Sequence, residues 1–141
     1  MASKRMCPDT VTLYNYIGEV GGRATYIKTY LQNVKCIVYL GVGTSTQGRG
    51  ESDTSMLYIF DDMLYAVNED GEEVQYMPYE EWLKLEDKAG YWTLNFDGDD
   101  FYVKGERIDA IPKKTKKFRI VGFKRLDQGR PRMAHFEVNG E

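Results

Sequence analysis

Few residues of this sequence have the side chains on which catalysis usually depends. Its 141 residues include one histidine, His135, and two cysteines, Cys7 and Cys36. A zinc finger takes about four cysteine or histidine ligands, and a catalytic triad pairs a histidine with a nucleophile and an acid. We therefore expect no enzyme activity, no metal site and no cofactor. His135 is expected to be a structural histidine on a strand, and both cysteines to be reduced thiols in a cytosolic setting.

A glycine-rich segment over residues 41–55 is the first candidate for binding chemistry. It begins Gly-Val-Gly, but position 46 is threonine where a G-x-G-x-x-G motif has its third glycine, and no Gly-Lys-Ser/Thr follows. We predict a long flexible loop that becomes ordered against a partner, rather than a nucleotide site. The residues singled out in this loop are Gly41, Gly43, Gly48, Arg49, Gly50, Glu51 and Asp53.

Acidic residues cluster at two predicted turns, 70–73 and 97–100. A calcium-binding helix-loop-helix needs a loop of about twelve residues that a glutamate closes, and neither cluster has that spacing. We interpret both clusters as acidic hairpin turns.

A run of basic and aromatic residues between 113 and 125 is the second candidate. Phe118 and Phe123 interrupt a series of lysines and arginines, and such mixtures on strands bind single-stranded nucleic acids. The same apolar residues also fit one side of a core strand, with 113–117 as a solvated loop, so both interpretations stay open. The basic residues of this candidate interface are Lys113, Lys114, Lys116, Lys117, Arg119, Lys124 and Arg125.

The sequence is divided into blocks of opposite charge, although its net charge is only −3. Residues 1–50 hold six lysines and arginines against two acids, residues 51–100 two against fifteen, and residues 104–132 eleven against three. Separate surfaces of opposite sign suit a head-to-tail contact between copies, which closes into a ring when the rotation allows. Solvated faces without a binding role are the alternative interpretation.

Alternating apolar and polar residues indicate that strands position these segments. We predict strands over 10–17, 23–31, 34–40, 56–60, 63–67, 72–77, 91–96, 101–104, 107–111, 118–126 and 133–138. Turns are expected at 18–22, 68–71, 97–100 and 127–131. One short helix is predicted over 78–85, because a proline and two glutamates suit the first turn of a helix.

Many short strands, with turn signals about every 8–12 residues, predict a mainly β fold. We expect a small antiparallel β-barrel or sandwich with one short helix and a long glycine-rich loop. The chain is long enough for one core, so we predict a single β-barrel domain over residues 1–141, with a flexible loop at 41–55. No apolar run approaches the roughly 18 residues that cross a bilayer, and the first residues lack a signal-peptide pattern. We therefore expect no export and no membrane partner.

Seven short segments carry a resemblance that covers nearly the whole chain. They are TVTLYNY (10–16), YIKTYLQNV (26–34), MLYIF (56–60), WTL (92–94), VKGE (103–106), FRIVGF (118–123) and HFEVNG (135–140). Together they resemble a family of short proteins that tailed phages and prophages of Gram-positive bacteria encode among their head and neck genes. More distantly, the order of elements is similar to that of the head-closure, or stopper, proteins of long-tailed phages.

The resemblance implies a structural virion protein of the phage neck, made in the bacterial host cytoplasm. Head-closure proteins are small β-barrels that form a ring, expected here as a hexamer or dodecamer, between the portal–adaptor complex and the tail protein. They retain packaged DNA, without sequence specificity, until the tail joins, and a long loop closes the channel. By position, residues 41–55 match that loop.

Two other classes of function stay open beside this head–tail connector. One is a different minor capsid or tail-completion protein of the virion. The other is a small β-barrel binding module for nucleic acid or for a host protein.

Overall fold

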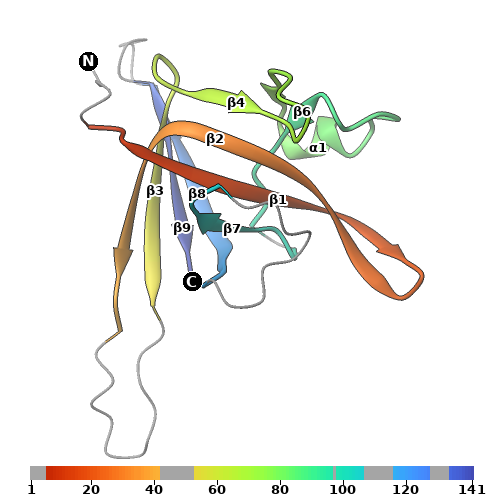
Figure 1. The fold of residues 1–141 in the computed structure, drawn as a ribbon, viewed down its shortest axis with the longest axis horizontal. Helices are drawn as coiled ribbons and strands as arrows, with labels where there is room; N and C mark the ends of the chain where they lie inside the picture. The colour runs from red at the N-terminus through yellow and green to blue at the C-terminus, as the bar shows by residue number, and fades with distance from the viewer. Residues whose placement is uncertain (1–5, 42–52, 97, 107–115, 128–133) are drawn as a thin grey trace, which may run out of the picture.

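A computed structural model of the chain describes residues 6–41, 53–96, 98–106, 116–127 and 134–141 (Figure 1). The elements are β1 (Asp9–Val20), β2 (Arg23–Tyr39), β3 (Thr54–Phe60), β4 (Tyr65–Val67), β5 (Gln75–Tyr76), α1 (Tyr79–Trp82), β6 (Tyr91–Trp92), β7 (Phe101–Lys104), β8 (Phe118–Leu126) and β9 (His135–Gly140). Strands predominate, and α1 is the single helix of these described ranges. The predicted mainly β fold with one short helix is confirmed.

Six strands pair side by side in a closed sheet. Their order is β1–β7–β8–β9–β3–β2, and β2 pairs again with β1. All six pairs are antiparallel. Because closure gives each of these strands a partner on both sides, much of its backbone is hydrogen-bonded within the chain and little edge is left for aggregation.

β2 is the longest strand, with 17 residues, and it joins the two halves of the closed sheet. Its residues up to Val34 pair with β1, and residues 35–39 pair with β3. Between these parts Asn33 has a φ of 60°, a left-handed conformation that asparagine tolerates better than most residues. The β1–β2 register shifts at the same point, between Asp9 and Thr10. This bulge bends one continuous strand, where the sequence predicted two separate strands at 23–31 and 34–40.

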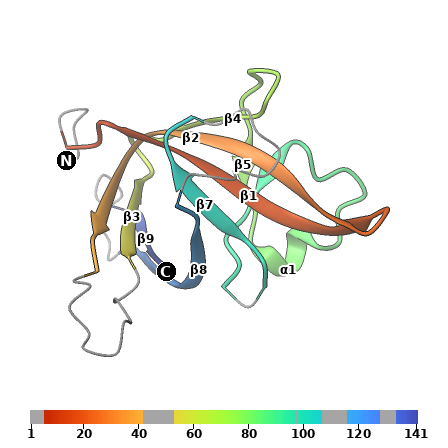
Figure 2. The same ribbon diagram turned by 60° about the horizontal axis from the view of Figure 1, so that its bottom comes forward.

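The core fills the inside of the closed sheet with alternate residues of its strands. Its most buried aliphatic members on the six strands are Val11, Leu13, Leu31, Val34, Leu57, Ile59, Ile120 and Val138. Residues 73–96, which we call the lobe, contain β5, α1 and β6 and add Val74, Trp92 and Leu94 to the same core. The lobe therefore packs against the closed sheet and belongs to the same core (Figure 2).

The strands and helix of the lobe differ in part from the prediction. The expected strands at 72–77 and 91–96 are reduced to two residues each, and β5 and β6 pair in parallel. The helix expected over 78–85 keeps four residues, because the N–H groups of Lys84 and Leu85 bond to carbonyls three residues back and tighten the last turn. The turn at 68–71 is confirmed, since Asn68 Oδ1 accepts hydrogen bonds from the N–H groups of Asp70 and Glu72. The predicted strand at 107–111 lies outside the described residues.

A buried polar network joins β1 to the lobe and to the start of β7. Asn15 Nδ2 donates hydrogen bonds to Asp100 Oδ2 (2.8 Å) and to the carbonyl of Thr93 (2.9 Å). The N–H of Tyr16 donates to Asp100 Oδ1 at 3.2 Å. Asp100 is only 2% exposed, and this burial raises its pKa to about 6, although the hydrogen bonds from Asn15 and Tyr16 oppose the rise. The carboxyl group is therefore part of the interior, not only of an acidic turn.

We expect the contribution of Asp100 to the free energy of unfolding to fall as the pH rises from about 4 to about 7. Its pKa is about 6 in the folded protein against an ordinary value of 3.8, so the folded state holds the proton more tightly. The contribution is complete below the lower pKa and is lost as the pH passes the higher one, and it amounts to about 3 kcal/mol. Urea unfolding of the wild type and of Asp100→Asn across this range measures it. Parallel pH profiles for the two proteins would contradict the prediction.

We expect Asn33→Ala to lower the free energy of unfolding by about 1 kcal/mol, because alanine is strained in the left-handed conformation. Asn33→Gly should be tolerated, since glycine adopts a positive φ readily. Asn139→Ala is the matched control, because Asn139 is exposed on β9, and it should change stability by less than about 0.5 kcal/mol. Urea unfolding checks all three variants, and equal losses at positions 33 and 139 would show that backbone strain is not the cause.

Candidate functional site

The predicted loop at 41–55 continues from β2 and returns to β3. Of its singled-out residues, Gly41 and Asp53 are described, whereas Gly43, Gly48, Arg49, Gly50 and Glu51 lie outside the described residues. The N–H of Gly41 donates a hydrogen bond to Asp53 Oδ1 at 2.9 Å, which joins the two ends of the segment. Tyr39 and Leu40, just before Gly41, are exposed. This end of the β2–β3 hairpin therefore presents apolar side chains at the surface.

The candidate basic interface is divided between the two ends of β8. Lys113 and Lys114 lie outside the described residues. The ammonium groups of Lys116 and Lys117 lie over Phe118 and Phe101, at 5.8 and 5.5 Å from the ring centroids. Arg119 follows on β8, where its side chain is exposed. These three cations form the positive part of the interface that is described.

At the far end of β8 the two remaining basic residues are ion-paired. Lys124 Nζ lies 3.6 Å from Glu137 Oε1. Arg125 makes a bidentate pair with Asp61, with Nη1 donating to Oδ1 at 2.7 Å and Nη2 to Oδ2. The hydrogen bonds to Asp61 raise the pKa of the guanidinium group. Because acids compensate these two charges, the five described basic residues do not make one continuous positive surface.

A groove lies beside the Arg125–Asp61 pair, between the lobe and β3, β8 and β9. Its volume is about 590 Å³, and its apolar walls are Ile59, Leu64, Ala66, Val74, Tyr76, Trp92, Phe123 and Phe136. A second hollow of about 310 Å³ shares Tyr76 and Phe123 with it and extends along Tyr79, Leu94 and Phe96. We call the two together the aromatic groove.

Ring contacts hold the walls of the aromatic groove in place. Tyr76 lies against Trp92 and Phe136, with centroid distances of 4.9 and 4.8 Å. The guanidinium carbon of Arg125 lies 4.7 Å from the centroid of the Phe136 ring, a cation–π contact. Burial raises the pKa of Tyr76. The groove is thus a preformed apolar surface.

The polar residues of the aromatic groove are mainly acidic. Its charged and amide residues are Asp61, Glu73, Gln75, Glu80, Glu81, Asn95 and Arg125. Arg125, the one cation in this set, is already paired with Asp61. An apolar floor with an acidic rim suits a partner that brings apolar and cationic side chains together.

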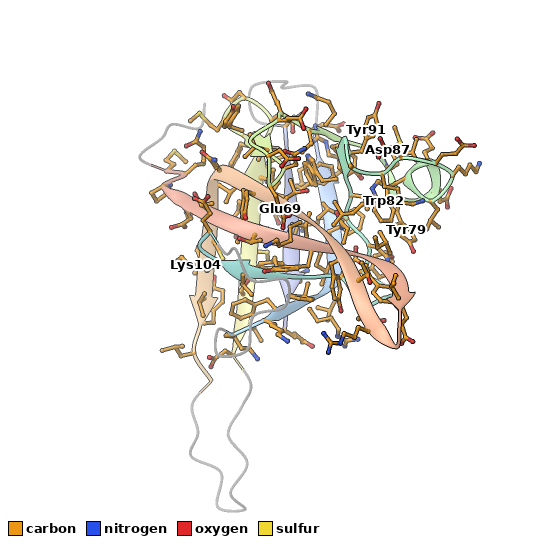
Figure 3. The ribbon with its side chains drawn as sticks, turned by 45° about the vertical axis from the view of Figure 1, so that its right-hand side comes forward. Glu69, Tyr79, Trp82, Asp87, Tyr91 and Lys104 are labelled. Carbon is orange, nitrogen blue, oxygen red and sulfur yellow. The ribbon has the colours of Figure 1, made fainter. Side chains whose placement is uncertain are left out.

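Charge is distributed unevenly over the described structure. Five of the fifteen acids of the block at 51–100 lie in the lobe, where Figure 3 shows Asp87 with Tyr79, Trp82 and Tyr91. Lys104 lies on the opposite side of the molecule in that view. Glu69 also has a cationic partner, since Lys28 Nζ lies 2.9 Å from its Oε1. The lobe is therefore an acidic part of the surface, with five acids against Lys84 and Lys88.

The residues first considered for chemistry occupy packing positions. The ring of His135 stacks on Phe60 at 4.7 Å, and its Nε2 lies 3.0 Å from Glu137 Oε2. Cys7 and Cys36 are both free and buried, and burial raises the pKa of both thiols. Within the described ranges, no group of three or more histidine, cysteine, aspartate or glutamate side chains is placed to hold a metal ion. Likewise, the described part of the chain contains no helix long and apolar enough to span a membrane.

The aromatic groove is the feature that sequence reasoning missed. Its wall residues come from positions 59 to 136, so no local sequence motif indicates that they lie together. The one available signal was the high aromatic content, 13% of the residues.

Comparison with known proteins identifies one family. A sequence model with the description "Family of unknown function (DUF6751)" matches residues 6–141. No curated protein and no solved structure matches the chain.

We expect Arg125→Ala to lower the free energy of unfolding by about 1 kcal/mol, because it removes both the bidentate pair with Asp61 and the contact with Phe136. Lys124→Ala is the matched control: this side chain is 66% exposed and its ion pair is longer. A loss below about 0.5 kcal/mol is expected for the control. Urea unfolding of both variants decides the matter, and equal losses would mean that Arg125 does not hold the wall of the groove.

Proposed function

The chain belongs to DUF6751, a family of unknown function, and we propose that it is a structural subunit of the phage neck. In this proposal it is a head-closure, or head–tail connector, protein. Its copies form a ring that joins the portal–adaptor complex to the tail and helps to retain packaged DNA. The closed sheet is then a small β-barrel that serves as the rigid body of each subunit.

The observation that carries the proposal is that two hairpins expose apolar side chains at different ends of the structure, and that the β1–β2 hairpin also reaches beyond the closed sheet (Figure 1). One is formed by β1 and β2 and exposes Ile17 and Val20, which are 44% and 71% accessible. The other is formed by β2 and β3 and exposes Tyr39 and Leu40. Exposed apolar residues at the ends of hairpins favour contact with other chains. Two such elements on one small subunit suit a part that binds neighbours on more than one side.

The separation of charge supports the same proposal. Lys104 and the acidic residue Asp87 of the lobe lie on different sides of the molecule (Figure 3). Unlike surfaces of opposite sign favour a head-to-tail contact between copies, and such contacts generate rings when the rotation closes. A ring subunit also uses shape and charge rather than a catalytic group.

A binding module for nucleic acid is the second candidate. Lys116 and Lys117 sit over aromatic rings and Arg119 is exposed beside them, which is a small basic and aromatic surface. The ion pairs of Lys124 and Arg125 reduce its extent. The connector is therefore favoured over this module.

We expect this protein in purified phage particles at a fixed ratio to the portal protein, because a ring has a defined copy number. Quantitative mass spectrometry of the particles measures that ratio. Heads assembled without the protein should lose their DNA before the tail joins.

Absence from clean particles would contradict the connector. A salt-dependent mobility shift with a single-stranded oligonucleotide, lost in the combined variant Lys116→Gln, Lys117→Gln and Arg119→Gln but not in Lys124→Gln, would then favour the binding module. A third outcome is that the protein is present in particles at a fixed ratio, while heads assembled without it keep their DNA. This outcome would favour another minor capsid or tail-completion role.

A further inference from the structure

The β1–β2 hairpin continues beyond the closed sheet. β1 pairs with β7 only through residues 11–14, and β2 pairs with β4 only through residues 30–32. From Tyr16 to Tyr26 the two strands pair with each other and with no other described strand. Figures 1 and 2 show this part reaching away from β3, β8 and β9. The tip of the hairpin is therefore accessible to a neighbouring molecule.

Several contacts make the projecting hairpin rigid. At its base Tyr26 packs edge-on against Tyr14 and Phe101, with centroid distances of 6.0 and 5.1 Å, and Tyr14 stacks on Phe101 at 4.5 Å. At its tip Gly21 and Gly22 have φ values of 60° and 78°, as a tight type I′ turn requires. A rigid hairpin loses little conformational entropy when it binds, which favours its use in a contact.

One face of the hairpin tip combines an apolar and a cationic side chain. Val20 pairs directly with Arg23, whereas Glu19 pairs with Ala24. Because successive residues of a strand point to opposite faces, Val20 and Arg23 lie on the same face of the hairpin, and Glu19 lies on the other face. Both Val20 and Arg23 are exposed. The tip therefore presents a valine and a positive charge together, on a face without an acid.

The aromatic groove has the complementary character. Its floor is apolar, and four acids against one paired arginine give its lining a negative balance. Val20 matches the floor, and Arg23 matches the acids Glu73, Glu80 and Glu81 of the rim, which have no ion-pair partner among the described residues. The volume of about 590 Å³ lies within the usual range for binding sites and exceeds the needs of one valine and the stem of one arginine.

We propose that the aromatic groove binds the β1–β2 hairpin tip of a second copy of this chain, with Val20 on the aromatic side chains and Arg23 beside the acidic rim. This inference rests on the proposed function and names the contact between neighbouring subunits of the ring. Tip and groove are different surfaces of the molecule, so each copy inserts its tip into one neighbour and receives the tip of the other. Such a heterologous contact propagates head to tail until it closes.

Disulfide trapping between two single variants of the full chain tests the contact. One variant is Val20→Cys, at the tip, and the other is Gln75→Cys, at the exposed polar edge of the groove. The two native cysteines are buried, so they do not compete for the new thiols. The variants carry tags of different mass, are mixed at high concentration in a glutathione redox buffer and are separated without reduction. We expect the disulfide between Val20→Cys and Gln75→Cys to form at least about tenfold more than either homodimer.

Leu83→Cys is the matched control for the groove position, because Leu83 is 51% exposed on the lobe but does not line the groove. Its disulfide with Val20→Cys should stay at the level of random collision. Adding Arg23→Glu to Val20→Cys should reduce the trapped product with Gln75→Cys severalfold, because the new charge repels the acidic rim. Equal trapping at positions 75 and 83 would overturn the inference, as would an unchanged yield with Arg23→Glu. Trapping of Gln75→Cys mainly with Tyr39→Cys would assign the groove to the β2–β3 hairpin instead and would also overturn it.

The result is separable from the test of the proposed function. Specific trapping by a protein that is absent from phage particles would retain the tip–groove contact and reject the neck assignment. A fixed ratio to the portal protein without specific trapping would retain the neck assignment and reject the tip–groove contact.

Discussion

The structure depends on one strand that serves two halves of a closed sheet. β2 pairs with β1 along its first part and with β3 along its last five residues, and the left-handed conformation of Asn33 lets it turn between them. A straight strand would carry its last residues past β3 and leave the sheet open. Closure in turn gives alternate residues of six strands a common interior, which is where the apolar core collects. The bend at one residue is therefore the condition for the closed sheet and for its core.

The lobe is held to this sheet by two kinds of interaction. Trp92 and Leu94 enter the core, while Asn15 of β1 bonds to the backbone of Thr93 and to the buried carboxylate of Asp100. Apolar packing alone would allow the lobe several orientations, whereas buried hydrogen bonds accept few. The fixed position of the lobe leaves the aromatic groove between it and β8 and β9. The groove is thus a consequence of how a short, irregular segment is anchored.

The proposed connector uses parts of the molecule that the core does not need. The hairpin beyond Tyr16, the exposed end of the β2–β3 hairpin and the rim of the aromatic groove contribute little to the closed sheet. Rigid projections and a preformed groove suit association, because little conformational entropy remains to be lost. A contact between tip and groove would also explain why valine, which folding favours inside, stands at the end of a hairpin. Charge then directs the contact, since the rim is acidic and the tip face is cationic.

The sequence by itself determined what depends on near neighbours along the chain. Strand periodicity predicted the mainly β fold. Local residue types predicted the turn at 68–71 and the place of α1. It also predicted the charge blocks and the structural character of His135. Only the tertiary structure decided the features that join distant residues: which strands pair to close the sheet, the parallel pairing of β5 with β6, the division of the basic residues between two ends of β8, and the groove. The pairing register of the strands, and contacts between distant residues such as Asp61 and Arg125, depend on how the whole core packs. The local sequence has no periodic pattern that indicates this packing.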